Sequence, residues 1–248
     1  MRTTTAASLA TIFLLAACDR NPAATPAPRD DAPWRDMHAH LRRHSSKSGA
    51  KLVFLGDSIT QAWAGNETWR RYYGPRGAVN LGIGGERTEE LLWRLDHGAL
   101  DGIEPRVVVL LIGTNNLADH TDEEVAGGVE AVVGRVRRLA PRARVLLLGI
   151  FPRGAVRGLD AASQVVWPRI EAANRLIRRL DDGGKIRVLD VGPALLDPDG
   201  TISREVMPDF LHLSPRGYRL WAEAMEPMLR SLLKDSPTPS SGPRLIVP

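Results

Sequence analysis

The segment Lys51-Leu-Val-Phe-Leu-Gly-Asp-Ser-Ile-Thr60 decides the fold. Its apolar run over residues 52–55 has the length and composition of a buried strand, and Gly56 ends that run. Asp57 and Ser58 follow, and both residue types favour helix N-caps and tight turns. The segment therefore predicts a strand that gives way to a helix, with the Ser58 hydroxyl at the strand's carboxyl end, where open α/β sheets bind ligands. A capping role for Asp57 or Ser58 is the simpler alternative.

Strands and helices alternate through the rest of the chain. Repeated strand–helix units predict one α/β domain with a parallel sheet and helices on both faces. Thr121 is the expected N-cap of one long helix, in which Gly127 and Gly128 indicate close packing. The predicted strands span residues 52–55, 79–81, 107–112, 144–150 and 186–191, and the predicted helices span 34–46, 88–95, 122–139, 170–180 and 214–233.

The composition is that of an ordinary globular protein, with 43% hydrophobic and 25% charged residues in a chain of 248, which is enough for one core. The formal net charge of +4 comes almost entirely from arginine. The basic residues are scattered and no basic patch contains interleaved aromatic residues, so nucleic-acid binding is not indicated. There is no thiolate cluster for zinc and no glycine-rich phosphate loop, and we therefore expect neither a metal nor a cofactor.

Residues 1–17 predict an export signal, because a weakly basic start is followed by an apolar segment too short to span a bilayer. The segment ends at Leu15-Ala-Ala-Cys18. This ending is similar to the lipobox of bacterial lipoprotein signals, in which cleavage precedes a cysteine whose thiol carries a diacylglyceryl group. Cys18 is the chain's one cysteine, so an intrachain disulfide is excluded. An ordinary secretory signal with an incidental cysteine is the alternative.

Residues 19–33 are rich in proline and alanine. This composition cannot bury a core and predicts an extended, disordered tether over residues 18–33 that would hold the domain ~45 Å from the membrane. We expect the domain itself over residues 34–234 and a disordered tail over 235–248. The protein would then be an exported bacterial lipoprotein, anchored in a membrane and facing the periplasm or the cell exterior. Asp19 does not decide between the inner and the outer membrane.

Three more polar stretches lie at predicted strand ends or before the last helix. Asn80-Leu-Gly-Ile-Gly-Gly-Glu-Arg-Thr88 has glycines that allow its backbone to approach a ligand, and Gly113-Thr-Asn-Asn116 carries two amides. Pro208-Asp-Phe-Leu-His-Leu-Ser-Pro215 places Asp209 and His212 three residues apart, which permits a hydrogen bond between them. Each stretch alone could be a turn, a cap or a satisfied histidine. Together they supply a nucleophile, a base, an orienting carboxylate and hydrogen-bond donors, as acyl transfer requires.

These four stretches, in this order, resemble the sequence blocks of the SGNH hydrolases, also called GDSL esterases and lipases, from about residue 54 to residue 218. The resemblance is closest to the branch that includes the platelet-activating-factor acetylhydrolase alpha subunits, and it implies a flavodoxin-like three-layer α/β/α sandwich with a five-stranded parallel sheet. Ile59 and Glu86 depart mildly from the pattern. The supporting segments are Gly56-Asp-Ser-Ile-Thr60 with Trp63, Asn80-Leu-Gly-Ile-Gly-Gly85, Leu92-Trp-Arg-Leu95, Gly113-Thr-Asn-Asn116 and Gly149-Ile-Phe-Pro-Arg-Gly154.

The resemblance implies a catalytic triad and an oxyanion hole. Ser58 would be the nucleophile, His212 the base, and Asp209 the carboxylate that orients the imidazole. The oxyanion hole would consist of the N–H groups of Ser58 and Gly85 and the side-chain amide of Asn115. No metal takes part in this chemistry.

We therefore expect a serine esterase that removes a short acyl group, acetyl above all, from an extracytoplasmic carbohydrate or lipid through an acyl-serine intermediate. One alternative is a lysophospholipase or thioesterase acting on longer acyl chains. A second alternative is a catalytically silent envelope lipoprotein that binds glycans. The sequence does not indicate the oligomeric state.

Several side chains could belong either to the substrate site or to ordinary structure. Arg87 and Arg153 could meet an anionic substrate group or form surface ion pairs. An apolar groove for a long acyl chain would need aromatic residues near the site, and the same residues could equally form the core. These aromatic residues are Trp63, Phe151, Trp167 and Phe210.

Overall fold

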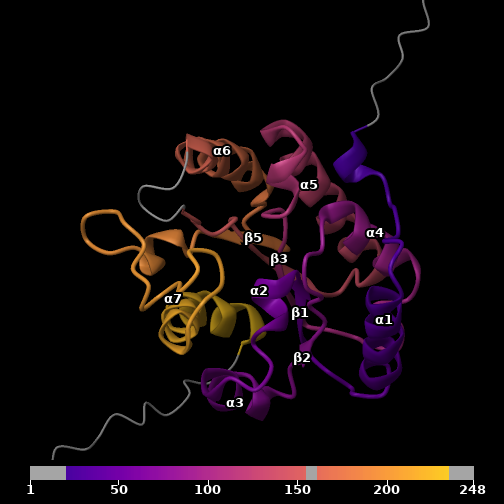
Figure 1. The fold of residues 1–248 in the computed structure, drawn as a ribbon. Coiled ribbons are helices and arrows are strands. Elements are labelled where there is room, and N and C mark those ends of the chain that lie inside the picture. The colour runs from indigo at the N-terminus through magenta and orange to yellow at the C-terminus, as the bar shows by residue number, and fades with distance from the viewer. Residues whose placement is uncertain (1–20, 155–160, 235–248) are drawn as a thin grey trace, which may run out of the picture.

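A five-stranded sheet forms the centre of the molecule (Figure 1). The structure is a computed structural model and describes residues 21–154 and 161–234. All strand pairings are parallel, which confirms the predicted α/β class and sheet, and each strand end lies within two residues of its predicted position. The strands, in the sheet order β2-β1-β3-β4-β5, are β2 (Val79–Asn80), β1 (Leu52–Gly56), β3 (Val107–Leu111), β4 (Arg144–Leu148) and β5 (Ile186–Leu189).

The register brings the carboxyl ends of the central strands to one edge of the sheet, called here the carboxyl edge. Gly56 at the end of β1 lies opposite Leu111 at the end of β3. Both strands are buried along their whole length, as expected for central strands of a parallel sheet. The loops that follow β1, β2 and β3 therefore start side by side at this edge.

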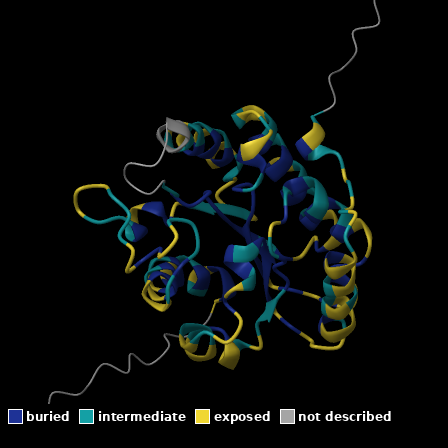
Figure 2. Ribbon diagram, in the orientation of Figure 1, coloured by how far each residue is buried: buried dark blue, intermediate teal, exposed yellow. Residues whose placement is uncertain are grey.

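Helices cover both faces of the sheet (Figure 1). One face carries α1 (Ala32–Ser45), α4 (Thr88–Asp96), α5 (Asp122–Leu139) and α6 (Ala161–Ile177) over a mainly aliphatic core, and the other carries α3 (Glu67–Tyr72) and α7 (Pro215–Leu233) over an aromatic one. Figure 2 shows the buried strands between helices whose outer surfaces are exposed. Short α2 (Ser58–Gln61) follows β1 directly. The 3-10 helices are η1 (Pro22–Ala24), η2 (Gly74–Arg76), η3 (Asn116–Ala118), η4 (Arg178–Leu180) and η5 (Gly192–Leu195).

The helix ends follow local capping chemistry where the sequence carries it. Thr121 and Glu124 form a reciprocal capping box at the start of α5, and Ser214 caps α7.

The predicted start of α6 at residue 170 is wrong, because the helix begins nine residues earlier and contains Pro168. Proline disfavours helix at the residue before it, so the pattern alone pointed to a later start. Helix α3 was not predicted.

The prediction of a disordered tether is wrong for residues 21–33. Residues 21–31, called here the N-terminal strap, pack along α4 and α5 before α1 begins. Ala23 has no exposed surface, and its carbonyl accepts the Thr88 hydroxyl at 2.7 Å. The Asn21 amide donates to the Glu124 carbonyl at 2.9 Å. The folded domain thus includes residues 21–33 as well as the residues from 34 onward.

Two glycines of α5 explain how the strap packs so closely. A Cβ on Gly127 would lie 2.5 Å from the Asn21 amide nitrogen, and one on Gly128 would lie 2.7 Å from the Ala23 carbonyl oxygen. At Gly128 the neighbour is backbone, so any larger residue would displace the strap, whereas at Gly127 it is the end of the Asn21 side chain. Both contacts agree with the close packing expected at these positions. Composition misled the prediction because alanine and proline bury little surface themselves but can pack closely against the helices α4 and α5.

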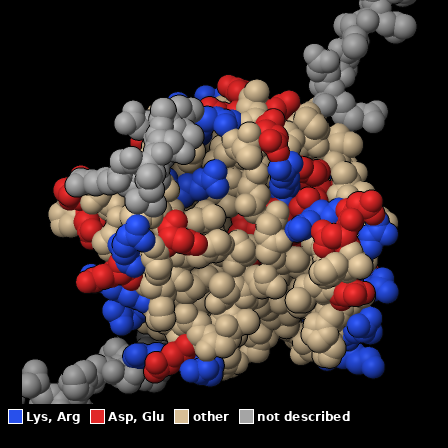
Figure 3. All heavy atoms as spheres, viewed as in Figure 1, with Lys and Arg blue, Asp and Glu red and all other residues tan. Residues whose placement is uncertain are grey.

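The predicted export signal, Cys18 and the tail over residues 235–248 lie outside the described residues. Within the described ranges, no helix is both long enough and apolar enough to cross a membrane. On the face shown in Figure 3, charged side chains lie mostly around the rim, with acidic and basic groups next to one another.

Candidate active site

Ser58 is the first residue of α2, directly beyond the carboxyl end of β1. The turn requires Gly56, because a Cβ there would lie 2.2 Å from the Leu111 carbonyl oxygen. Asp57 caps the helix by accepting the Ile59 N–H at 2.9 Å, so the capping role expected for Asp57 is real. The Ser58 N–H has no acceptor in the part of the chain that the structure describes, as is usual for the first turn of a helix.

His212 connects Ser58 to Asp209. Its Nε2 lies 2.9 Å from the Ser58 Oγ, and its Nδ1 lies 2.7 Å from the Asp209 Oδ2. The other carboxylate oxygen of Asp209 accepts the backbone N–H groups of Leu211 at 3.0 Å and His212 at 2.7 Å. Although partial burial opposes it, the hydrogen bonds from His212 and Leu211 lower the pKa of Asp209, so its carboxylate stays ionised at neutral pH.

A left-handed residue shapes the loop that carries this histidine. Phe210 has a φ of 62°, a region that residues other than glycine rarely adopt and that marks locally strained backbone. Its carbonyl accepts the Gly154 N–H at 3.0 Å, and its ring lies 4.7 Å from the Arg204 guanidinium. The loops before α7 and after β4 are thereby joined at the site.

The glycine-rich loop after β2 packs directly on α2. A Cβ on Gly82 would lie 2.5 Å from the Gln61 backbone nitrogen, and one on Gly84 would lie 3.9 Å from the Ser58 Cβ. Gly85 has a φ of 73° and is exposed. Its N–H has no acceptor among residues 21–154 and 161–234, so it is available to a ligand beside Ser58.

The structure distinguishes Asn115 from Asn116. The Asn115 amide donates one proton to the Glu86 carbonyl at 2.8 Å and keeps the second free. Asn116 is fully buried, with its oxygen accepting the Thr88 N–H and its nitrogen donating to Thr88 and Glu89. Asn116 therefore supports the loop structure, and Asn115 is the residue left with a donor for a ligand.

Sequence reasoning missed a buried ion pair behind this loop. Glu86 and Arg94 contact at 2.7 Å with fully buried side chains, and the Trp34 indole donates to the other Glu86 oxygen at 2.8 Å. Burial raises the pKa of Glu86, and Arg94 opposes that rise. In the sequence, Arg94 belongs to the family-like segment Leu92-Trp-Arg-Leu95, but that segment does not show that the side chain is buried or that it pairs with Glu86. The pair fixes the backbone that follows Gly85.

Two of the four aromatic residues considered for an acyl groove belong to the core instead. Trp63 and Phe151 are 0% and 2% exposed. Their ring centroids lie 4.7 Å and 5.0 Å from that of Trp221 in α7. Phe210 and Trp167 are partly exposed.

The two arginines considered for substrate binding differ in their surroundings. Arg87 forms ion pairs with Asp119 and Glu89, which fits the surface-pair interpretation. Arg153 is partly buried, and its positive charge acts on Asp57, which itself is 1% exposed. Burial raises the pKa of Asp57 to about 7. Arg153 thus lies near the candidate site, whereas Arg87 is neutralised locally.

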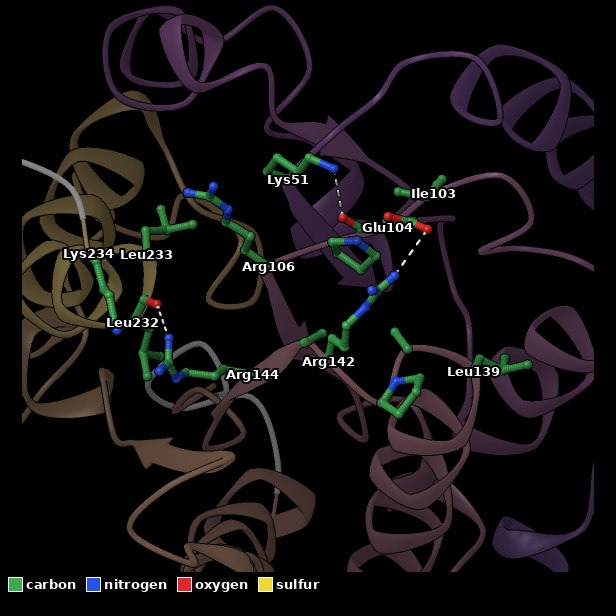
Figure 4. Close-up of a pocket in the computed structure, with 14 residues that line it drawn as sticks. Lys51, Ile103, Glu104, Arg106, Leu139, Arg142, Arg144, Leu232, Leu233 and Lys234 are labelled. Atoms are coloured by element: carbon green, nitrogen blue, oxygen red, sulfur yellow. Dashed lines mark hydrogen bonds and ion pairs between the residues drawn. The ribbon is translucent and has the colours of Figure 1, made fainter.

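A cavity of about 830 Å³ lies at the opposite edge of the sheet, where the strands begin (Figure 4). Its cationic side chains are partly held by structural contacts: Arg142 pairs with Glu104 at 3.2 Å, and Arg144 donates to the Leu232 carbonyl at 2.7 Å. The first contact joins the segments that precede β3 and β4, and the second ties the start of β4 to the end of α7. The cationic lining residues are Lys51, Arg106, Arg142, Arg144 and Lys234.

Known proteins match this chain over most of its length. The model of the GDSL-like Lipase/Acylhydrolase family matches residues 54–220. Platelet-activating factor acetylhydrolase IB subunit alpha1 of Rattus norvegicus is 37% identical over 233 residues, covering 90% of this chain and 97% of the rat protein.

Two solved structures share the fold. A GDSL-like lipase from Bacteroides thetaiotaomicron superposes with a TM-score of 0.62 and 18% identity, over 78% of this chain and 98% of that one. An acetyl xylan esterase superposes with a TM-score of 0.58 and 22% identity, over 72% and 98%.

Proposed function

The chain belongs to the GDSL-like lipase/acylhydrolase family and is an ester hydrolase, and on this premise we propose that Ser58, His212 and Asp209 are its catalytic triad. The observation that carries the proposal is the unbroken series of contacts from the Ser58 Oγ to His212 Nε2, at 2.9 Å, and from His212 Nδ1 to Asp209, at 2.7 Å. A nucleophile, a base and an orienting carboxylate in this arrangement define serine hydrolase chemistry.

In the acylation step, the Ser58 Oγ attacks the ester carbonyl carbon while His212 Nε2 takes the hydroxyl proton. The negative charge that develops on the carbonyl oxygen is stabilised by the Ser58 N–H, the Gly85 N–H and the Asn115 amide. When the bond to the leaving alcohol breaks, His212 returns the proton to that alcohol. Asp209 orients the ring and stabilises its positive charge without taking the proton.

In the second step, water attacks the acyl-Ser58 ester and gives a proton to His212. The bond between the acyl carbon and Ser58 breaks, His212 returns the proton to the Ser58 Oγ, and the carboxylic acid leaves. Every proton is transferred through one imidazole, so the reaction as written needs only water and the ester.

We propose a short acyl group, acetyl above all, on an extracytoplasmic carbohydrate or lipid. The relatives named as acetylhydrolases support the short chain, and so does the location of Trp63 and Phe151 in the core, where neither can line a long groove. The acetyl xylan esterase shows that this fold also carries acetyl ester hydrolysis in another protein.

We also propose that Cys18 carries a lipid anchor. Cys18 precedes Asn21, the first described residue of the strap, by three positions, and a chain of that length reaches at most ~11 Å. The anchored cysteine would then lie far closer to the domain than the ~45 Å expected of a disordered tether. Asn21 contacts the first turn of α5, near the carboxyl edge. The anchor would therefore place the candidate site close to the membrane surface. Labelling with an alkynyl fatty acid, lost in Cys18→Ala, tests this proposal.

Fluorophosphonate labelling tests the catalytic assignment. The probe should label the wild-type protein at Ser58, while Ser58→Ala should remain unlabelled and His212→Ala should be labelled much more slowly. If the folded wild-type protein were not labelled, the catalytically silent glycan-binding protein would be the better account.

A further inference from the structure

The N-terminal strap reaches the loop that would bind the oxyanion. Arg29 donates from Nη1 to the Gly84 carbonyl oxygen at 2.8 Å, and a Cβ on Gly85 would lie 3.4 Å from the same nitrogen. Asp31 holds the guanidinium from another side, with its Oδ2 2.9 Å from Nε. Asp31 is itself fixed, because its Oδ1 accepts the Trp34 N–H at 2.7 Å in the first turn of α1. The guanidinium is thus held between α1 and the Gly84 carbonyl.

The strap that carries Arg29 is attached to the domain at other points. The Ala27 N–H donates to the Glu89 carbonyl at 3.0 Å, and the Ala23 carbonyl accepts the Thr88 hydroxyl. These bonds fasten the strap to the start of α4. Arg29 therefore contacts the glycine loop from a fixed position.

The peptide that Arg29 contacts is the one that carries a proposed oxyanion donor. The Gly84 carbonyl and the Gly85 N–H belong to one planar trans peptide unit, in which the two groups point in opposite directions. Arg29 fixes the Gly84 carbonyl so that it points toward the guanidinium. The Gly85 N–H must therefore point away from Arg29. A donor on the carbonyl also polarises the peptide and strengthens its N–H as a donor, and a charged donor does so most.

The geometry points to Arg29 as a positioning residue for the reaction, which sets the direction and the donor strength of the Gly85 N–H. This inference rests on the proposed serine esterase activity. The oxyanion forms only in the transition state, so loss of Arg29 affects kcat and leaves KM nearly unchanged. In this role the guanidinium acts through the Gly84–Gly85 peptide.

The test uses variants of the full chain with p-nitrophenyl acetate as substrate. Arg29→Ala should lower kcat about 10-fold, less than outright loss of an oxyanion donor, with KM within about twofold. It should weaken inhibition by an alkyl boronic acid, whose serine adduct mimics the tetrahedral oxyanion, by a similar factor. Arg29→Lys keeps a charged donor and should recover most of the loss in both measurements.

Two control variants separate this role from a structural one. Arg70 donates to the Gly65 carbonyl at 2.9 Å away from the site, so Arg70→Ala removes the same kind of bond. Asn21→Ala loosens the strap at α5 but leaves Arg29 in place. Both should stay within about twofold of wild type.

The proposal is overturned if Arg29→Ala keeps the wild-type kcat and boronate affinity, or if Asn21→Ala lowers both equally. If Ser58→Ala retained esterase activity, the proposed function itself would fail, and the two failures are thus distinguishable.

Discussion

The Asn115 side-chain amide donates a hydrogen bond to the Glu86 backbone carbonyl at 2.8 Å. This bond joins the loop after β3 to the loop after β2, two of the segments that meet at the carboxyl edge. The bond fixes the rotamer of the Asn115 side chain and leaves its second amide proton free. Because the bond is made to Glu86, the residue that follows Gly85, it holds the Asn115 amide next to the glycine-rich loop. Preorganised donors of this kind stabilise an oxyanion because they need no reorientation during the reaction.

Asn115→Ala should therefore lower kcat for p-nitrophenyl acetate by about 10² to 10³, with a much smaller change in KM. Steady-state kinetics give both values. Asn66→Ala is the control, because it removes an asparagine N-cap from α3 and should cost stability alone, about 1 kcal/mol. An Asn115→Ala variant within tenfold of wild type would remove Asn115 from the oxyanion hole.

Arg94→Met should destabilise the fold by about 3–5 kcal/mol, because it leaves the Glu86 carboxylate buried without its partner. Urea unfolding at pH 8 measures the change. Arg142→Ala breaks the Arg142–Glu104 pair, in which both side chains are mostly exposed, and should cost less than about 1 kcal/mol. If both variants lost the same free energy of unfolding, the buried Glu86–Arg94 pair would contribute no more to stability than the exposed Arg142–Glu104 pair.

Asp57→Asn should change the pH dependence of stability. Burial raises the pKa of Asp57 to about 7, so between pH 4 and 7 the folded protein binds more protons than the unfolded chain. Its free energy of unfolding therefore falls as pH rises through that window. The Asp57→Asn variant does not lose stability in this way. Its free energy of unfolding should equal that of the wild type near pH 4 and exceed it by about 4 kcal/mol above pH 7.

Urea unfolding at pH 4.5, 6 and 8 measures this difference, and Asp101→Asn, at an exposed position, should follow the wild-type profile. A difference between Asp57→Asn and wild type that stays constant with pH would contradict the assignment.

Gly128→Ala should destabilise the protein by about 1–3 kcal/mol, because the new Cβ would lie 2.7 Å from the Ala23 carbonyl oxygen and push the strap away. Gly134→Ala in the same helix has only the Arg138 guanidinium at 3.8 Å, so it should stabilise by up to about 1 kcal/mol. Thermal unfolding should show the two opposite signs. If both variants were stabilised, the strap would not depend on the space at Gly128.

The sequence could predict those parts that depend on neighbouring residues. The strand, turn and helix around Ser58 and the three-residue spacing of Asp209 and His212 are local patterns, and the structure brings these side chains together. The buried Glu86–Arg94 pair was out of reach, because its burial depends on Trp34, 52 residues away from Glu86 in the chain. The strap was missed for the same reason, since it packs against α4 and α5, which are distant from it in the sequence.

The chain-length dependence of ester hydrolysis tests the central claim most directly. The measurement compares p-nitrophenyl acetate, butyrate and octanoate with the chain from residue 19 onward, which keeps the strap, and with its Ser58→Ala variant. We predict that kcat/KM falls steeply from acetate to octanoate and that Ser58→Ala abolishes hydrolysis of all three. A rate that rises with chain length would contradict the short-acyl assignment, and activity that survives in Ser58→Ala would contradict the serine mechanism itself.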